Sequence, residues 1–129
     1  VAKAAHTLNG FPINKQDFVA GDFWVVMKRL NRVRATFDCV ILDPPFFAET
    51  AFGRFDLEKD VTRLINKVRP LVNDGGRIVA VNNALFLSGA NYQAALQSLC
   101  VGGYVEIEGQ IDVAGDFLGN SAEFIIPPP

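Results

Sequence analysis

The spacing of apolar residues divides the chain into alternating helices and strands. The clearest helical signal covers residues 57–68, where apolar side chains recur every three or four positions, as on one face of a helix: Leu57, Val61, Leu64, Ile65 and Val68. A helix is also predicted after Asp22, which is a suitable N-cap, and others are predicted at 1–8 and 91–100. Short apolar or alternating runs predict strands at 13–19, 37–42, 77–81, 104–111 and 122–126.

This order predicts an α/β fold. Strands that alternate with helices favour a mostly parallel sheet with covered faces. The last two strands, 104–111 and 122–126, follow each other without a helix and are predicted to form a C-terminal antiparallel strand pair. A length of 129 residues is that of one domain. The segments 43–56 and 69–76 are interpreted as a loop and as a helix exit into a tight turn.

The most informative segment is Asp43-Pro44-Pro45-Phe46-Phe47, directly after the strand at 37–42. Two prolines end a strand, because neither can donate a ladder hydrogen bond. The chain therefore leaves the carboxyl end of a strand as a stiff turn, at the edge where open α/β sheets bind ligands. Its carboxylate, carbonyl groups and rings suit a flat, polar, nitrogen-containing substrate. The alternative is a plain strand exit with both phenylalanines in the core.

Composition and charge narrow the functional classes. Half of the residues are hydrophobic and a fifth are charged, which excludes a disordered chain. No apolar stretch approaches the ~20 residues of a membrane span, and no signal peptide is evident, so a cytoplasmic protein is expected. A net charge of −2 argues against a self-sufficient nucleic-acid binder. Four cations between Lys28 and Arg34 are interpreted as a solvated helix end.

Metal chemistry is not expected. Cys39, Cys100 and His6 have no metal-ligand spacing. Both cysteines are predicted to be buried free thiols.

Several motifs together resemble the class I S-adenosylmethionine-dependent methyltransferases. They are Asn9-Gly10, Gly21-Asp22, the strand with Asp43-Pro44-Pro45-Phe46, Gly75-Gly76-Arg77-Ile78 and Asn82-Asn83. The Asp-Pro-Pro-x-Phe element is similar to that of bacterial 23S ribosomal RNA methyltransferases. The resemblance implies a Rossmann-like methyltransferase sheet and S-adenosylmethionine as cofactor. It also implies an enzyme that methylates a base in ribosomal RNA.

The resemblance also implies roles for individual residues. Asp22 would hold the adenine amino group of the cofactor, with Phe23 and Asp43 as further cofactor-binding residues, although Asp22 can equally be a helix cap. Asp43 and the Pro44 carbonyl would accept hydrogen bonds from the target base, within a catalytic set that also includes Pro45, Phe46 and Asn82. Phe46 or Phe47 would stack on the base. Phe47 and Asn83 would bind the substrate.

The position of Asn82-Asn83 bears on which atom is methylated. The cytosine-C5 branch of the family carries a nucleophilic cysteine there, because C5 reacts only after covalent attack at C6. An Asn-Asn pair instead resembles the guanine-N7 branch, in which a ring lone pair needs only orientation and desolvation. A strand-end turn with local hydrogen bonds is the alternative interpretation.

The chain also departs from the family pattern. It lacks the Gly-rich first loop and the acidic residue after the second strand, which hold the methionine and ribose parts of the cofactor. Residues 1–129 are therefore expected to be the C-terminal two-thirds of the domain, without its first two strands, unless another chain supplies them. RNA is expected to bind through a domain not present here. A methyltransferase for a small molecule or a protein side chain, and a non-catalytic interaction scaffold, remain alternatives.

Overall fold

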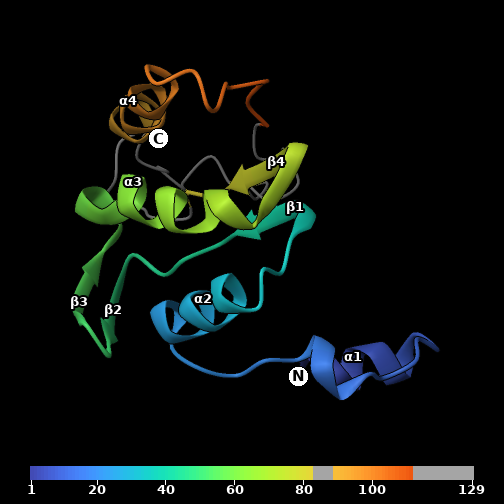
Figure 1. Cartoon of the computed structure of the whole chain (residues 1–129). Helices are drawn as coiled ribbons and strands as arrows, with labels where there is room; N and C mark the ends of the chain where they lie inside the picture. Colours follow the sequence, from blue (N-terminus) through green and yellow to red (C-terminus); the bar gives the residue numbers. More distant parts are fainter. Residues whose placement is uncertain (83–88, 112–129) are drawn as a thin grey trace, which may run out of the picture.

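The computed structural model describes residues 1–82 and 89–111. Within these described residues, four α-helices and four strands follow one another in the order shown in Figure 1. Two single 3-10 turns, η1 and η2, lie between them. The elements are α1 (Ala2–Leu8), η1 (Lys15–Asp17), α2 (Phe23–Arg32), β1 (Phe37–Leu42), β2 (Phe47–Thr50), β3 (Gly53–Asp56), α3 (Leu57–Val68), η2 (Arg69–Leu71), β4 (Val72–Ala80) and α4 (Gly89–Cys100).

The central sheet of the described residues is the parallel pair β1–β4. Cys39 pairs with Arg77 and Leu42 pairs with Ala80, so the predicted strands at 37–42 and 77–81 are confirmed as parallel neighbours. The register shifts after Phe37, because β4 carries extra residues around Gly75. Gly75 has a φ of +73°, so the turn predicted from its sequence appears as an irregularity inside β4.

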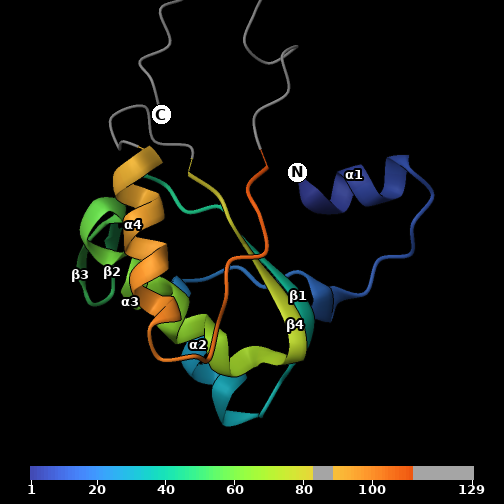
Figure 2. The same ribbon diagram turned by 90° about the horizontal axis from the view of Figure 1, so that it is seen from above.

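The three helices α2, α3 and α4 lie on the same side of the β1–β4 pair, whereas α1 lies apart (Figure 2). The apolar face of α3 contributes most of the buried core residues. The core cluster consists of Trp24, Phe55, Leu57, Val61, Leu64, Ile65 and Tyr92. The α/β fold class with a parallel sheet is thus confirmed, and the core lies between the helices and one face of the sheet.

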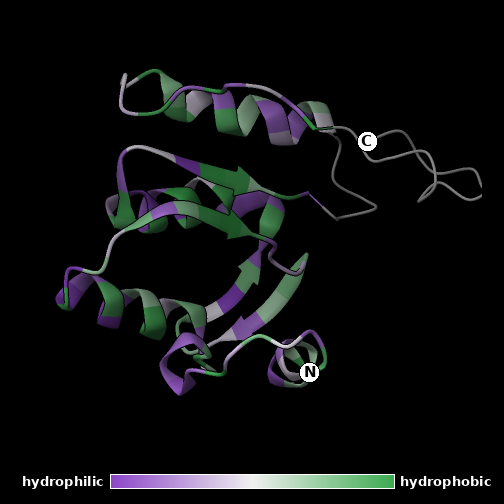
Figure 3. Ribbon diagram, turned by 90° about the vertical axis from the view of Figure 1, so that its right-hand side faces the viewer, coloured by the Kyte–Doolittle hydropathy of each residue, from purple (hydrophilic) through white to green (hydrophobic). Residues whose placement is uncertain are grey.

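The opposite face of the sheet is open in the part of the chain that the structure describes. Ile41 is 69% exposed, and Figure 3 shows apolar colouring along both strands. Cys39 lies in β1 and is exposed, while Cys100 is half-buried at the end of α4. The prediction of two buried thiols is therefore wrong, because only one face of this strand pair is covered by the described helices.

Residues 43–56 do not form the predicted loop. They contain the antiparallel hairpin β2–β3, in which Phe47 pairs with Asp56 and Thr50 pairs with Gly53. The turn is closed by the Thr50 hydroxyl, which donates to the Gly53 carbonyl at 2.6 Å. Gly53 supports this turn because its φ of +101° is strained for any other residue. Among the described residues, the antiparallel pairing is that of this hairpin, β2 with β3.

Two predicted strands are absent from the described residues. The segment 13–19 holds the 3-10 turn η1, because the Asn14 side chain accepts from the Gln16 N–H and nucleates a turn. No described strand lies beside 13–19 to complete a ladder. Residues 104–111 are also not a strand, and the proposed partner at 122–126 lies outside the described residues. The predicted C-terminal antiparallel pair is therefore not formed by 104–111.

Candidate functional site

The carboxyl ends of β1 and β4 lie side by side. Leu42 is opposite Ala80, and the Val81 N–H donates to the Leu42 carbonyl at 2.9 Å, which extends the ladder one residue further. Asp43 and Asn82 therefore leave the sheet from neighbouring strands at the same edge. Asn83, the second predicted amide, lies outside the described residues.

The two phenylalanine rings that follow Asp43-Pro44-Pro45 differ in exposure. Phe46 is half-buried and packs against the core, and its carbonyl accepts from the Leu57 N–H at 2.9 Å. Phe47 is 46% exposed, with 4.3 Å between the two ring centroids. Of the two rings, Phe47 is the one accessible to a ligand. Pro44 is half-buried, whereas Asp43 and Pro45 are exposed.

One charged neighbour of Phe47 could not be identified from the sequence interpretation. The guanidinium carbon of Arg54 in β3 lies 4.4 Å from the centroid of the Phe47 ring in β2. This contact depends on the hairpin, which was interpreted as a loop. The alternation of polar and apolar residues after Gly53, Arg54-Phe55-Asp56, was the available signal, because such a run beside a glycine favours a strand that leaves a turn.

Asp22 joins the start of α2 to the hairpin. Its Oδ1 accepts from the Trp24 N–H at 2.9 Å and from the Val25 N–H at 3.3 Å, so it is the predicted N-cap. Its Oδ2 accepts from the Ala51 N–H at 2.9 Å, in the turn between β2 and β3. The cap interpretation is confirmed, and the contact with Ala51 is an addition that helix periodicity could not reveal.

These hydrogen bonds lower the pKa of Asp22 below its ordinary value, with the Ala51 N–H as the largest cause. A carboxylate with a lowered pKa in the folded state stabilises that state above the unfolded pKa, near pH 4. The stabilisation is lost as the pH falls through the lower, folded-state pKa. The Asp22 carboxylate is therefore ionised at neutral pH.

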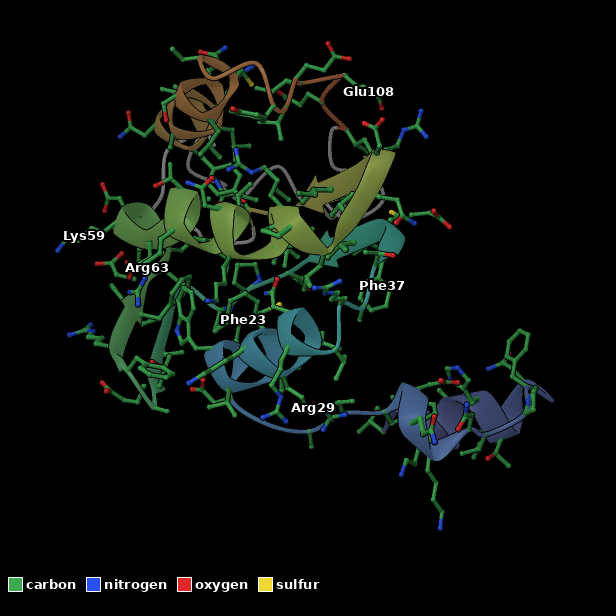
Figure 4. All side chains as sticks on the ribbon, viewed as in Figure 1. Phe23, Arg29, Phe37, Lys59, Arg63 and Glu108 are labelled. Carbon is green, nitrogen blue, oxygen red and sulfur yellow. The ribbon has the colours of Figure 1, made fainter. Side chains whose placement is uncertain are left out.

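Phe23 is the first residue of α2. Its ring is half-buried and meets the Trp24 ring edge-on at 4.9 Å between centroids. Figure 4 shows Phe23 on the side of α2 that faces α3, and it packs against the core. The first backbone N–H groups of a helix have no partner within it, so this helix start places N–H donors beside the Asp22 carboxylate.

Tyr92 supports the strand end that carries Asn82. Its ring is 7% exposed within the core, and its hydroxyl donates to the Val81 carbonyl at 3.3 Å. Burial raises the pKa of the Tyr92 phenol, so the hydroxyl stays protonated and remains a donor. Tyr92 lies in the helix predicted at 91–100, but helix periodicity could not reveal its position beside Val81.

Metal-binding clusters and membrane-spanning helices are both absent from the described ranges 1–82 and 89–111. No cluster of three or more His, Cys, Asp or Glu side chains there could hold a metal ion. No helix in the same ranges has the length and apolar character that crossing a membrane requires.

Known proteins are similar to this chain in sequence over part of its length. No family model matches the chain. It is 34% identical over 84 residues to the ribosomal RNA large subunit methyltransferase K/L of Shewanella pealeana (strain ATCC 700345 / ANG-SQ1), over 64% of this chain and 11% of that protein. It is 34% identical over 85 residues to YwbD of Bacillus subtilis (strain 168), provisionally named a ribosomal RNA large subunit methyltransferase, over 62% of this chain and 22% of that protein.

A solved structure resembles the fold. SMU.776, provisionally assigned as a methyltransferase and crystallised in complex with SAH, superposes with a TM-score of 0.67 and 24% sequence identity. The superposition covers 74% of this chain and 25% of that one. The chain has a methyltransferase fold. The predicted resemblance to S-adenosylmethionine-dependent methyltransferases is therefore confirmed. The chain spans about a tenth to a fifth of the length of the curated relatives that it matches.

Proposed function

We propose that residues 1–129 form part of an S-adenosylmethionine-dependent methyltransferase domain that methylates a base in ribosomal RNA. The observation that carries the proposal is the shared carboxyl edge of β1 and β4, where Asp43 and Asn82 emerge together. The names of the relatives support ribosomal RNA as the substrate. A cytoplasmic location and contact with RNA through a further domain belong to the same proposal.

The start of α2 fits the adenine end of the cofactor. The exocyclic amino group of adenine is a donor and its ring nitrogens are acceptors. Asp22 offers an ionised acceptor at the start of α2, next to the backbone N–H of Phe23. Asp22 Oδ2 accepts from the Ala51 N–H, and a carboxylate oxygen has capacity for a second hydrogen bond. We assign Asp22 and Phe23 to adenine recognition and Asp43 to the side of the cofactor nearest the substrate.

When bound, S-adenosylmethionine supplies the methyl group of the reaction. This chain's residues orient the base that receives it. In the proposal, Asp43 and the Pro44 carbonyl accept hydrogen bonds from N–H groups of the base, and Pro45 keeps the turn rigid. Phe47 stacks on the base, which is worth about 1–3 kcal/mol. Phe46 anchors this turn through the core, and Asn82 adds an amide at the same edge. Substrate binding by Asn83 belongs to the same proposal.

The position of the cysteines favours a nitrogen atom of the base, such as guanine N7, over cytosine C5. Methylation at C5 needs a thiolate beside the base. Cys39 lies opposite Arg77 in the ladder, several residues before the carboxyl end of β1, and Cys100 ends α4. Asn82 occupies the edge itself. A ring nitrogen already has a lone pair, so orientation and exclusion of water are sufficient for transfer.

The cofactor assignment is tested by calorimetric titration of the chain with S-adenosylhomocysteine. Saturable binding is expected, and Asp22→Asn is expected to weaken it about tenfold, the size of one charge-assisted hydrogen bond. Asparagine is chosen because it caps a helix as well as aspartate does, so α2 should be retained. Circular dichroism confirms that the variant is folded.

Asp17→Asn is the matched control, because it removes the same charge from the exposed turn η1. Its affinity for S-adenosylhomocysteine should equal that of the unmodified chain. Unchanged affinity of a folded Asp22→Asn variant would reduce Asp22 to a helix cap. Absence of binding by the folded, unmodified chain would contradict the proposed cofactor site.

The choice of atom is tested by replacing both thiols. Cys39→Ser/Cys100→Ser is expected to keep methyl transfer to ribosomal RNA within about twofold, because no covalent step uses a thiol. Mass spectrometry of the digested RNA should identify a nucleoside methylated on nitrogen. Detection of 5-methylcytosine, or loss of transfer in a folded double variant, would contradict the assignment.

A further inference from the structure

A second feature lies between α2 and α3, beside the tip of the hairpin. Trp24 and Lys28 are four residues apart on α2, and Arg63 and Lys67 are four residues apart on α3. Residues at this spacing share one helix face. The two faces meet around a cleft of about 220 Å³, which Phe52 from the tip of the hairpin closes at one end. This basic-aromatic cleft is lined by Trp24, Lys28, Phe52, Arg63 and Lys67.

The cleft is positively charged in a protein whose net charge is −2. Of its three cations, Arg63 has the carboxylate of Asp60 at 3.7 Å, in a pair whose arginine is 56% exposed. Such exposed pairs are worth little free energy, so Arg63 can exchange Asp60 for another anion. The segment from Phe23 to Thr36 contains no acidic residue. The cations are therefore concentrated locally, and the interpretation of Lys28 as part of a solvated helix end is incomplete.

The two aromatic rings of the cleft differ in exposure: Trp24 is buried and Phe52 is exposed. Trp24 is 7% exposed, and the guanidinium of Arg63 lies 4.3 Å from the centroid of its ring. This contact fixes Arg63 toward α2, and Figure 4 shows Arg63 on the side of α3 nearest the hairpin. Phe52 is 61% exposed, so one of its faces remains available for stacking. Figure 4 also shows Lys59 extending away from this region.

We propose that the basic-aromatic cleft binds single-stranded RNA, with Lys28, Arg63 and Lys67 on the phosphates and Phe52 stacked on a base. Cations beside an exposed aromatic ring are the combination by which proteins hold single strands. A volume of about 220 Å³ is small for a whole drug-sized ligand but suits one phosphate with its sugar. The inference rests on the proposed function, which makes RNA the expected macromolecular ligand.

The position of the cleft agrees with this role. Asp22 accepts from the N–H of Ala51, the residue before Phe52, so the hairpin tip is held at the start of α2. The cleft therefore begins beside the residues assigned to the cofactor. RNA held there is close to the site where a base is to be methylated, and this chain shares RNA binding with any further domain.

The test measures fluorescence anisotropy of a labelled 12-nucleotide single-stranded RNA with the 129-residue chain, from about 50 to 200 mM salt. Each cation that neutralises a phosphate changes the slope of log affinity against log salt by about 0.7 for a single strand, or about fivefold in affinity at 0.1 M salt. Lys28→Gln/Lys67→Gln is therefore expected to bind about 25-fold more weakly and with a slope smaller by about 1.4. Phe52→Ala should lose about tenfold in affinity.

The matched control is Lys3→Gln/Lys59→Gln, which removes the same charge from α1 and from the outer side of α3. It should bind RNA as the unmodified chain does. An equal loss in this control, or no saturable RNA binding by the folded chain, would overturn the proposal. The S-adenosylhomocysteine titration is independent: cofactor binding without RNA binding refutes only the cleft, whereas RNA binding without cofactor binding refutes the proposed function.

Discussion

Leu57→Ala is expected to lower the free energy of unfolding by about 3 kcal/mol. Leu57 begins α3, and its side chain is 0% exposed within the core cluster. Truncation of a buried leucine removes its transfer energy and leaves a cavity, which together cost about 2–5 kcal/mol. Domains are stable by about 5–15 kcal/mol, so this single change removes a large fraction of the total. Urea unfolding followed by circular dichroism at 222 nm measures the difference.

The same substitution at an exposed site is the control. Leu8 lies at the end of α1 and is 86% exposed, so Leu8→Ala should change the free energy of unfolding by less than about 0.5 kcal/mol. The fluorescence of Trp24, the one tryptophan of the chain, provides a second probe of the core. Equal stabilities of the two variants would contradict the placement of Leu57 at the centre of the core.

Gly76→Ala is expected to cost about 2 kcal/mol through a steric conflict. A Cβ atom at Gly76 would lie 2.7 Å from Val72 Cγ1 and 2.9 Å from the carbonyl oxygens of Asn73 and Asp38. Two of these three atoms are backbone, one in β4 itself and one in β1, so relief requires both a change in the irregular part of β4 and a shift of β1. Added volume in a packed region typically costs about 1–3 kcal/mol. Thermal unfolding and amide exchange of β1 should both report the change.

Gly109→Ala is the comparison for this second prediction. A Cβ atom there meets no atom within 4 Å, and the backbone of Gly109 is not left-handed. Its unfolding midpoint should match that of the unmodified chain. A tolerated Gly76→Ala variant would mean that β1 and β4 are less closely packed at this point than the structure indicates.

The sequence predicted the elements whose signals are local and mutually consistent. The bounds of α3 agree with the prediction because five apolar positions share one face and Asp56 caps the helix, accepting from the Glu58 N–H. The bounds of β1 also agree, because two prolines end it. The proximity of Asp43 and Asn82 could be predicted as well, since parallel strands end at the same edge.

The strand at 13–19 and the basic-aromatic cleft depend on interactions between distant segments, whereas the hairpin is a local failure. The strand predicted at 13–19 lacked a partner among the described strands, and alternation alone cannot supply one. The hairpin was not predicted because the turn at Pro44 and Pro45 was extended to a loop over all of 43–56. The basic-aromatic cleft was not predicted because Lys28 and Lys67 line the same cleft only when α2 and α3 lie side by side in the folded chain. Sequence spacing shows which residues share a helix face, but not which faces meet.

The two strand pairs differ in the number of residues that separate their paired positions along the chain. Phe47 pairs with Asp56 across the short turn at Ala51 and Phe52, whereas Leu42 pairs with Ala80 across the hairpin and all of α3. Long closures cost more entropy and slow the formation of the contacts that depend on them. We therefore expect β2, β3 and α3 to assemble early during folding. Asp43 and Asn82 become neighbours only when the long closure is complete, so the chain acquires its candidate site late.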